Sequence, residues 1–383
     1  MTGLLTEEQA MIRDTARSFA AGRLAPGATA RAAAGRIEPE IISDMAAMGF
    51  FGMTVPEALG GIGADAVSYA LALMEIAAGD GAVSTMMSVH NAPFCAILSR
   101  HATPVQQDRW LRPAARGAYI GAFALTEPQA GSDTGALRSR ARRDGNGYVL
   151  DGEKQFITSA RICGGMIAFA VTDPAAGKKG LSAFYIPVGT PGLTIGAPER
   201  KMGQRASDTC AVRFAGLRIG EDHRIGAEGQ GLSIALSALE TGRIGIAAQS
   251  VGMAQAALEV ALGYAQDRAA FGKPIGQHQA VAFRLADMDV QVEAARQLVL
   301  NAARVKDAGQ PCLREASIAK LFASEMAERV VSAAIQTLGG YGYLEDFPLE
   351  RIARDVRVCQ IYEGTSDVQR INISRALFGE GRR

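Results

Sequence analysis

One stretch near the C-terminal end carries residues that could do acid–base chemistry. In IYEGTSDVQR, residues 361–370, a single carboxylate, Glu363, precedes Gly364 and the hydroxyl residues Thr365 and Ser366. Glycine lets the backbone pass close to a ligand, and the N–H groups at a helix start attract phosphate or carbonyl oxygens. A base beside such donors would make a reaction centre. The same residues also suit an ordinary helix start, in which Glu363 is a first-turn acid and Thr365 or Ser366 is the N-cap.

Two segments in the middle of the chain also combine hydroxyl side chains with turn residues. ALTEPQAGSD, residues 124–133, begins as a strand and turns through Pro128 and Gly131, and it could equally be a simple polar turn. KQFIT, residues 154–158, ends a strand with an aromatic and a hydroxyl residue. A buried Phe156 beside a solvated Thr158 would explain that pattern without any function.

Three further segments lie in the C-terminal half. LETGRIGIAAQ, residues 239–249, opens a helix with Arg243 in its first turns, where a cation is mildly unfavourable. A partner for Arg243 is therefore expected, although a surface arginine is the plainer interpretation. DRAAFGKPIGQHQ, residues 267–279, and QTLGGYGY, residues 336–343, suit turns between helices, with glycines as C-cap residues.

Three kinds of elements must position these segments. The N-terminal third predicts helices, beginning with a capping box of Thr6 and Gln9 and continuing at residues 39–48, 66–78 and 83–99. From Tyr119 to about Arg224, short apolar runs between turn clusters indicate a mostly β domain. Long helices then follow, and they are expected at residues 242–266, 281–302 and 313–338. In the second of these, apolar residues recur at alternating steps of four and three and form a seam for packing in a bundle.

Composition excludes several classes of protein. The chain has 383 residues, 48% of them hydrophobic, and 40 Lys+Arg against 39 Asp+Glu, so it has no charge excess to attract nucleic acid or an anionic membrane. Its five cysteines form no CxxC pair, and its four histidines are too few for a histidine-built metal centre. The start, MTGLLTEEQAM, has no basic region followed by an apolar core. We expect a cytoplasmic protein without a metal site or a membrane span.

Taken together and in this order, the segments resemble the acyl-CoA dehydrogenase family over essentially the whole chain. The most specific motifs are TEPQAGSD, FIT, GRIGIAAQ, RAAFG with Gln279, QTLGGYGY and IYEGTSDVQR. The resemblance is to the short-chain, bacterial type. It implies a mostly α fold with a helical N-terminal domain (residues 1–118), a central β-barrel-like domain (119–226) and a C-terminal four-helix bundle (227–383). It also implies one FAD per subunit and a homotetramer built as a dimer of dimers.

The same resemblance implies a reaction. Glu363 is expected to remove the proton α to the thioester carbonyl of an acyl-CoA while a hydride leaves the β carbon for the flavin, giving the trans-2-enoyl-CoA. The carbonyl oxygen would accept hydrogen bonds from the Glu363 backbone N–H and from the FAD ribityl 2′-hydroxyl. Burial should raise the pKa of Glu363. The electrons would pass to electron-transfer flavoprotein.

The family's other roles fall on matching positions of this sequence. The residues expected to bind substrate are Ser132, Glu240, Thr241, Gly242, Arg243 and Gly364. The residues expected to bind FAD, partly that of a neighbouring subunit, are Phe123, Leu125, Thr126, Ser132, Phe156, Thr158, Arg268, Phe271, Gln279, Gln336, Gly339, Gly340, Thr365 and Asp367.

The sequence departs from the family pattern at a few of these positions. Many relatives have tryptophan at the position of Phe156. Phenylalanine keeps the stacking face of that residue but lacks its indole N–H. Asp367 stands where relatives often carry Gln or Glu. In isovaleryl- and long-chain-type members the base immediately precedes the arginine of the bundle helix, and here that residue is Gly242. Glu363 is therefore the only carboxylate that matches a family base position.

Other functions on the same fold would require different features. Acyl-CoA oxidases are usually longer, and nitroalkane oxidases would use aspartate as the base. A non-catalytic flavin- or CoA-binding homologue should lack the base, and a nucleic-acid-binding relative should carry an added basic region. The length and branching of the acyl group stay open, because they depend on a few pocket residues that could include Met86, Met87 and Val89.

Overall fold

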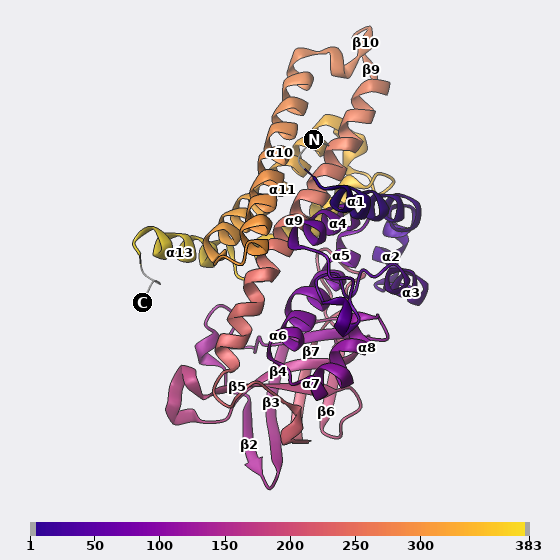
Figure 1. The fold of residues 1–383 in the computed structure, drawn as a ribbon. Coiled ribbons are helices and arrows are strands. Elements are labelled where there is room, and N and C mark those ends of the chain that lie inside the picture. Colours follow the sequence, from indigo (N-terminus) through magenta and orange to yellow (C-terminus); the bar gives the residue numbers. More distant parts are fainter. Residues whose placement is uncertain (1–4, 380–383) are drawn as a thin grey trace.

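A computed structural model describes residues 5–379 of the chain, so residues 1–4 of the expected N-terminal segment and 380–383 of the bundle lie outside it. The chain forms a helical N-terminal region, a central sheet and a long helical bundle (Figure 1). The β-rich part lies at one end of the molecule, and the hairpin of α9 (Gly231–Asp267) and α10 (Gln279–Asp307) projects from the other end. This arrangement matches the mostly α fold with a central β domain that the sequence predicts.

The N-terminal region begins with the predicted capping box. Thr6 Oγ1 accepts a hydrogen bond from Gln9 N, and Gln9 Oε1 accepts one from Thr6 N, each at 3.1 Å. The predicted helix over residues 83–99 is a continuous helical run with a π-helical turn around Pro93, which has no N–H to donate. The principal helices are α1 (Glu7–Phe19), α2 (Ala28–Ala34), α3 (Pro39–Ala47), α4 (Ala66–Gly79), α5 (Gly81–Val89), η5 (His90–Cys95), α6 (Ala96–His101), α7 (Pro104–Gln106) and α8 (Arg112–Ala115).

The central region is a mostly antiparallel sheet with the strand order β6-β7-β3-β2-β4-β5-β8, and β1 pairs with β4 in parallel. Alternate side chains of the strands fill two apolar clusters, one on each side of the sheet. The strands are β1 (Ile120–Ala124), β2 (Arg140–Asp144), β3 (Gly147–Thr158), β4 (Cys163–Val171), β5 (Leu181–Pro187), β6 (Leu193–Pro198), β7 (Thr209–Gly220) and β8 (Arg224–Ile225).

The bundle contains α9 (Gly231–Asp267), α10 (Gln279–Asp307) and α11 (Leu313–Leu338), followed by α12 (Leu349–Val356) and α13 (Ser366–Leu377). The predicted seam of α10 is confirmed, because Leu285, Met288, Val292, Ala295, Val299 and Ala302 are buried and Val281 packs against the same core. The prediction that a helix begins at Gly242 is wrong, since α9 begins at Gly231. Close packing against other elements accommodates most of the glycines of this helix.

Two other details differ from the sequence-based interpretation. The segment between α9 and α10 is more than a turn, because β9 (Ala269–Ala270) pairs antiparallel with β10 (Lys273–Pro274). Helix α9 is also long and apolar enough by composition to cross a membrane. However, 78% of its most apolar window is buried inside the protein, as in the core helix of a bundle.

Candidate active site

A cavity of about 200 Å³ lies where the N-terminal helices, the sheet and the bundle meet. The residues that line it are far apart in the sequence. The fold brings together residues of η5, the ends of β1 and β3, α9 and the turn before α13. The predicted site residues that line it are Phe123, Leu125, Thr126, Ser132, Phe156, Thr158, Arg243, Glu363 and Gly364. The fold therefore assembles acid–base, cationic and aromatic groups around one space.

Glu363 lies in the turn that leads to α13, not in the first turn of the helix. It has a φ of 56°, and Gly364 follows with a φ of 89°, so two consecutive residues adopt left-handed conformations. Thr365 is the N-cap and accepts a hydrogen bond from Val368 N at 3.3 Å. The turn directs the Glu363 carboxylate back onto α9, where a Cβ added to Gly242 would lie 2.1 Å from Oε2.

The environment of Glu363 suits a base that works near neutral pH. Its Oε2 is buried and makes no hydrogen bond within residues 5–379. Burial raises the pKa of Glu363 to about 7, in the direction expected from the sequence, and the charges of Arg243 and Lys320 only partly oppose that rise. Its backbone N–H also donates to no acceptor among the described residues, so it is free to bind a ligand oxygen.

Arg243 provides the cation of the site. The extension of α9 places it well inside the helix, so it does not lie in the first turns as the sequence suggested. The side chain is 5% exposed and Nε has no hydrogen-bond partner within the described part of the chain. Burial lowers the pKa of Arg243, while the charges of Glu363 and Glu240 counteract that effect. A buried arginine that lines a cavity with a free donor can receive a polar or anionic ligand group.

The opposite wall is held by a buried ion pair. Lys154 Nζ lies 2.8 Å from Glu127 Oε1 and donates to the Leu125 carbonyl at 3.1 Å. Burial acts to raise the pKa of Glu127, but the Lys154 charge and hydrogen bonds from Lys154, Ser139 and Arg138 outweigh it and lower the value to about 2. Gln155 N also donates to the Thr126 carbonyl at 2.8 Å. These bonds tie the 124–133 loop to β3.

Phe156 and Thr158 lie at the end of β3. Phe156 is 62% exposed and has a φ of 60°, so the interpretation of Phe156 as a buried core residue is wrong. An exposed aromatic ring at the mouth of a cavity offers a flat apolar face to a ligand.

Tyr362 joins the site to all three regions of the fold. Its hydroxyl donates to Gln249 Oε1 of α9 and accepts from Gln204 Nε2 at 3.3 Å. Thr85 of α5 lies 3.5 Å from the same hydroxyl. Because buried polar groups keep their geometry only while every partner is present, this network fixes the residue just before Glu363.

The remaining predicted site residues lie outside this cavity. Glu240 and Thr241 precede Arg243 on α9, and Glu240 Oε1 accepts a hydrogen bond from Cys312 Sγ at 3.1 Å. Asp367 is exposed and pairs with Arg370 at 3.3 Å. Gly242 lies against Glu363, and Thr365 caps α13. Six predicted residues gather around the far end of the bundle, where Arg268, Gly339 and Gly340 line a second cavity of about 530 Å³, Gln336 lines another, and Phe271 and Gln279 are exposed.

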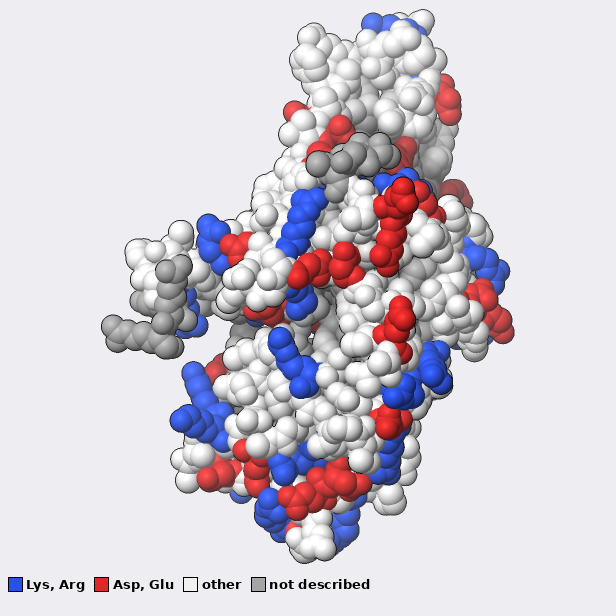
Figure 2. Space-filling model, in the orientation of Figure 1, with Lys and Arg blue, Asp and Glu red and all other residues white. Residues whose placement is uncertain are grey.

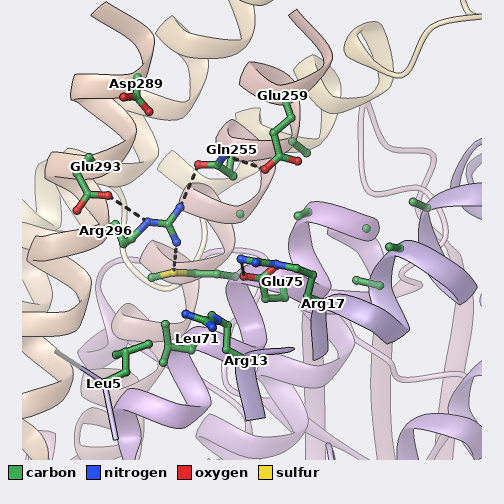
Figure 3. Close-up of a pocket in the computed structure, with 18 of the residues that line it drawn as sticks. Leu5, Arg13, Arg17, Leu71, Glu75, Gln255, Glu259, Asp289, Glu293 and Arg296 are labelled. Carbon is green, nitrogen blue, oxygen red and sulfur yellow. Dashed lines mark hydrogen bonds and ion pairs between the residues drawn. The ribbon is translucent and has the colours of Figure 1, made fainter. Parts of the chain in front are cut away.

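A larger cavity of about 680 Å³ lies between α1 and α4 on one side and α9 and α10 on the other (Figure 3). Its charges largely satisfy one another. Arg17 Nη2 lies 2.8 Å from Glu75 Oε1, and Arg296 Nη2 donates to Gln255 Oε1 at 3.0 Å. None of the predicted site residues lines it. On the face shown in Figure 2, acidic and basic side chains are interspersed, without a large patch of one sign.

Three family models cover almost the whole chain. The acyl-CoA dehydrogenase N-terminal domain matches residues 6–118, the middle domain 122–217 and the C-terminal domain 229–378. The chain belongs to the acyl-CoA dehydrogenase family. Its members are FAD-dependent oxidoreductases.

One curated relative and two solved structures illustrate the similarity. The mitochondrial short-chain specific acyl-CoA dehydrogenase of Bos taurus is 43% identical over 374 residues, covering 98% of this chain and 91% of the relative. Butyryl-CoA dehydrogenase from Megasphaera elsdenii is 39% identical with a TM-score of 0.96, covering 99% of this chain and 100% of that one. A chain in the structure described as electron transferring flavoprotein of Acidaminococcus fermentans is 41% identical with a TM-score of 0.96, covering 98% and 99%.

The cavity fits the family's cofactor. Phe123, Leu125 and the exposed ring of Phe156 supply apolar surface, while Thr126 and Thr158 add hydroxyl groups. Gly131 has no atom within 4 Å of an added Cβ, so the backbone there is open to a bulky ligand. No group of three or more metal-ligating side chains occurs within residues 5–379.

Several lining residues of this acyl-CoA dehydrogenase were not identified from the sequence. Val89 does line the cavity, whereas Met86 and Met87 are fully buried and do not. Others that sequence analysis missed are Pro93, Gly131, Thr134, Ile157, Leu236, Leu239, Ile246, Tyr362 and Val368. Leu236, Leu239, Ile246 and Val368 are apolar residues within ordinary helices, so their spacing carries no signal of a ligand site.

Proposed function

We propose that this chain removes the α proton and the β hydride of a short- or medium-chain acyl-CoA, linear or branched, and releases the trans-2-enoyl-CoA. The observation that carries this proposal is Glu363, a carboxylate with a pKa near 7 that lines a cavity whose opposite wall suits a flavin. The short-chain specific relative and the butyryl-CoA dehydrogenase structure support a short acyl group.

Glu363 is the proposed base. An α proton of a thioester is a very weak acid, so a catalytic base must be basic enough to accept it and the developing enolate charge must be stabilised. A carboxylate whose pKa lies near 7 is a stronger base than an ordinary glutamate and remains partly ionised at neutral pH. The free Glu363 N–H would donate to the thioester oxygen. When bound, FAD supplies the acceptor for the hydride.

The other predicted residues keep the roles that the resemblance gave them. Arg243, with Glu240, Thr241, Gly242, Ser132 and Gly364, would hold the substrate. The residues of the opposite wall would hold the flavin ring, and Thr365 and Asp367 would contact the rest of FAD. We also retain the proposed domain divisions at 118/119 and 226/227, which precede β1 at Ile120 and α9 at Gly231.

Anaerobic titration of the purified, FAD-loaded protein with a panel of acyl-CoAs tests this function. We expect the flavin absorbance to bleach with butyryl- to octanoyl-CoA, because these chains offer an α proton and a β hydride, and to change little with palmitoyl-CoA. Acetyl-CoA, which has no β carbon, is the matched control and should leave the flavin oxidised. If no saturated acyl-CoA reduces the flavin, the proposed reaction is wrong.

Electron-transfer flavoprotein is the proposed electron acceptor, and the proposed location is the cytoplasm. The matching chain in the structure described as an electron transferring flavoprotein supports this partner. Reduced enzyme mixed with electron-transfer flavoprotein should be reoxidised within seconds, whereas air should reoxidise it slowly. Rapid reoxidation by air alone would favour an oxidase.

We propose that the protein is a homotetramer. Phe271 is 96% exposed at the tip of the α9–α10 hairpin, and Phe283 and Val290 of α10 are 60% and 67% exposed. Exposed apolar side chains on this scale indicate an interface, and a neighbouring copy would bring Arg268, Phe271 and Gln279 to its FAD. Sedimentation should give four times the 40.2 kDa chain mass. Phe271→Ser should weaken FAD retention, and a monomer that retains FAD would contradict both claims.

A further inference from the structure

A buried lysine lies behind the turn that carries Glu363. The Lys320 side chain, on α11, is 0% exposed, and its Nζ donates to the Gly364 carbonyl at 2.8 Å. No carboxylate of the described residues lies within ion-pair distance of it. Lys154 is equally buried, but it lies 2.8 Å from Glu127. A buried ammonium group without a paired carboxylate is costly, so Lys320 calls for an explanation other than a structural ion pair.

The turn that Lys320 contacts is strained. Glu363 and Gly364 have φ angles of 56° and 89°, and a left-handed conformation at a non-glycine residue persists only when its surroundings enforce it. Gln369 Nε2, on α13, donates to the Gly364 carbonyl at 2.8 Å and to the Glu363 carbonyl at 3.4 Å. Lys320 and Gln369 therefore hold the same carbonyl from two helices. Both side chains are 0% exposed, so water cannot replace these donors.

We propose that Lys320 is a positioning residue for the base: together with Gln369 it fixes the Gly364 carbonyl, so that the Glu363 carboxylate stays against Gly242 and its N–H stays open to the cavity. This inference rests on the proposed function. Lys320 touches neither the cavity nor the reacting atoms, since it is absent from the cavity lining. It acts through the backbone of the turn and through its charge.

The charge of Lys320 contributes in a direction that can be measured. The charged groups that act on Glu363 are Arg243 of α9 and Lys320 of α11, and both oppose the rise in its pKa. Burial lowers the pKa of Lys320 to about 8, while Cys359, Glu363 and Glu325 raise it and Arg243 lowers it further. Lys320 is therefore mainly cationic at pH 7. If that cation is removed, Glu363 should bind its proton more tightly.

Two substitutions separate the donor from the charge. Lys320→Met removes both from a side chain of similar length, and Gln369→Met removes a donor alone. With butyryl-CoA and the FAD-loaded proteins, we expect both variants to reduce their flavin about 10- to 100-fold more slowly than wild type, since small misplacements of a base are costly. Only Lys320→Met should also move the midpoint of the kcat/KM profile upward from its wild-type value near 7, by about one pH unit. Lys320→Arg should recover most of the rate.

Controls distinguish positioning from folding. Dissociation constants for butyryl-CoA and FAD should change less than the rate constant, because Lys320 does not line the cavity. Unchanged rates and midpoints in Lys320→Met would overturn the proposal, as would a wild-type rate in Gln369→Met. If Lys320→Met fails to fold, Gln369→Met and Lys320→Arg decide the question. A wild-type rate in Gln369→Met then counts against the proposal.

The crystal structure of Lys320→Met gives a readout that needs no turnover. We expect Glu363 to leave the left-handed region and its carboxylate to move off Gly242. A turn that is unchanged in the variant would overturn the proposal even if the wild-type enzyme acts on another substrate. If wild type reduces no flavin with any acyl-CoA while the Lys320→Met turn does rearrange, the proposed reaction fails and the positioning role stands.

Discussion

Glu363→Gln is expected to abolish rapid flavin reduction while leaving the protein folded and loaded with FAD. Glutamine has nearly the shape of glutamate, and its amide fits the same space against Gly242, but it cannot accept a proton at neutral pH. Loss of a general base typically costs about 10²–10⁴-fold. We expect the upper end of that range, because the rate of a very unfavourable proton transfer depends strongly on the base. Anaerobic stopped-flow mixing with butyryl-CoA measures the effect directly.

The matched control for this substitution is Glu259→Gln. Glu259 lies on α9 and lines the larger cavity, away from the proposed site (Figure 3). The same chemical change there should leave the rate of reduction within about twofold. If Glu363→Gln reduces its flavin as fast as the control, the base lies elsewhere.

The pH profile of the wild-type enzyme provides a second check on Glu363. Because burial raises its pKa to about 7, the carboxylate is protonated below that pH and cannot act as a base. The kcat/KM value, which reports groups of the free enzyme, should therefore rise as the pH increases through 7. Glu363→Gln should lose this rise.

Local patterns in the sequence predicted much of the fold. The capping box at Thr6 and the seam of α10 depend on residues within a few turns of one another, and the structure confirms both. The start of α9 was predicted wrongly because the prediction used the same kind of local pattern. Helix propensity penalises Gly242, but this glycine lies against the carboxylate of Glu363, more than a hundred residues later. A local pattern contains no record of that contact.

The candidate site likewise contains residues that local motifs identified and residues that they missed. Thr126, Thr158, Arg243 and Glu363 were identified because they belong to recognisable motifs, and the fold places them around one space. Lys320 and Gln369 were missed because a lysine and a glutamine in amphipathic helices usually point to solvent. Only their burial and their shared contact with the Gly364 carbonyl give them a role.

Gly242→Ala is expected to separate activity from stability. An added Cβ would lie 2.1 Å from Glu363 Oε2 and 2.8 Å from Cδ. Non-bonded carbon atoms do not approach so closely, so the carboxylate must move by about 1 Å, and a displacement of that size can cost about 10²-fold in rate. Alanine also favours a helix interior over glycine by about 1 kcal/mol. The melting temperature should therefore change little while flavin reduction slows.

Gly263→Ala supplies the control on the same helix. Gly263 has nothing within 4 Å of an added Cβ, so this variant gains the helix preference without a clash and should keep the wild-type rate. Comparing the two proteins removes the effect of helix propensity and leaves that of the Gly242 contact. Should Gly242→Ala reduce its flavin as fast as Gly263→Ala, the carboxylate does not need this space, and another group must be the base. A slow Gly242→Ala with an unchanged melting temperature would show that glycine stands here to make room for Glu363.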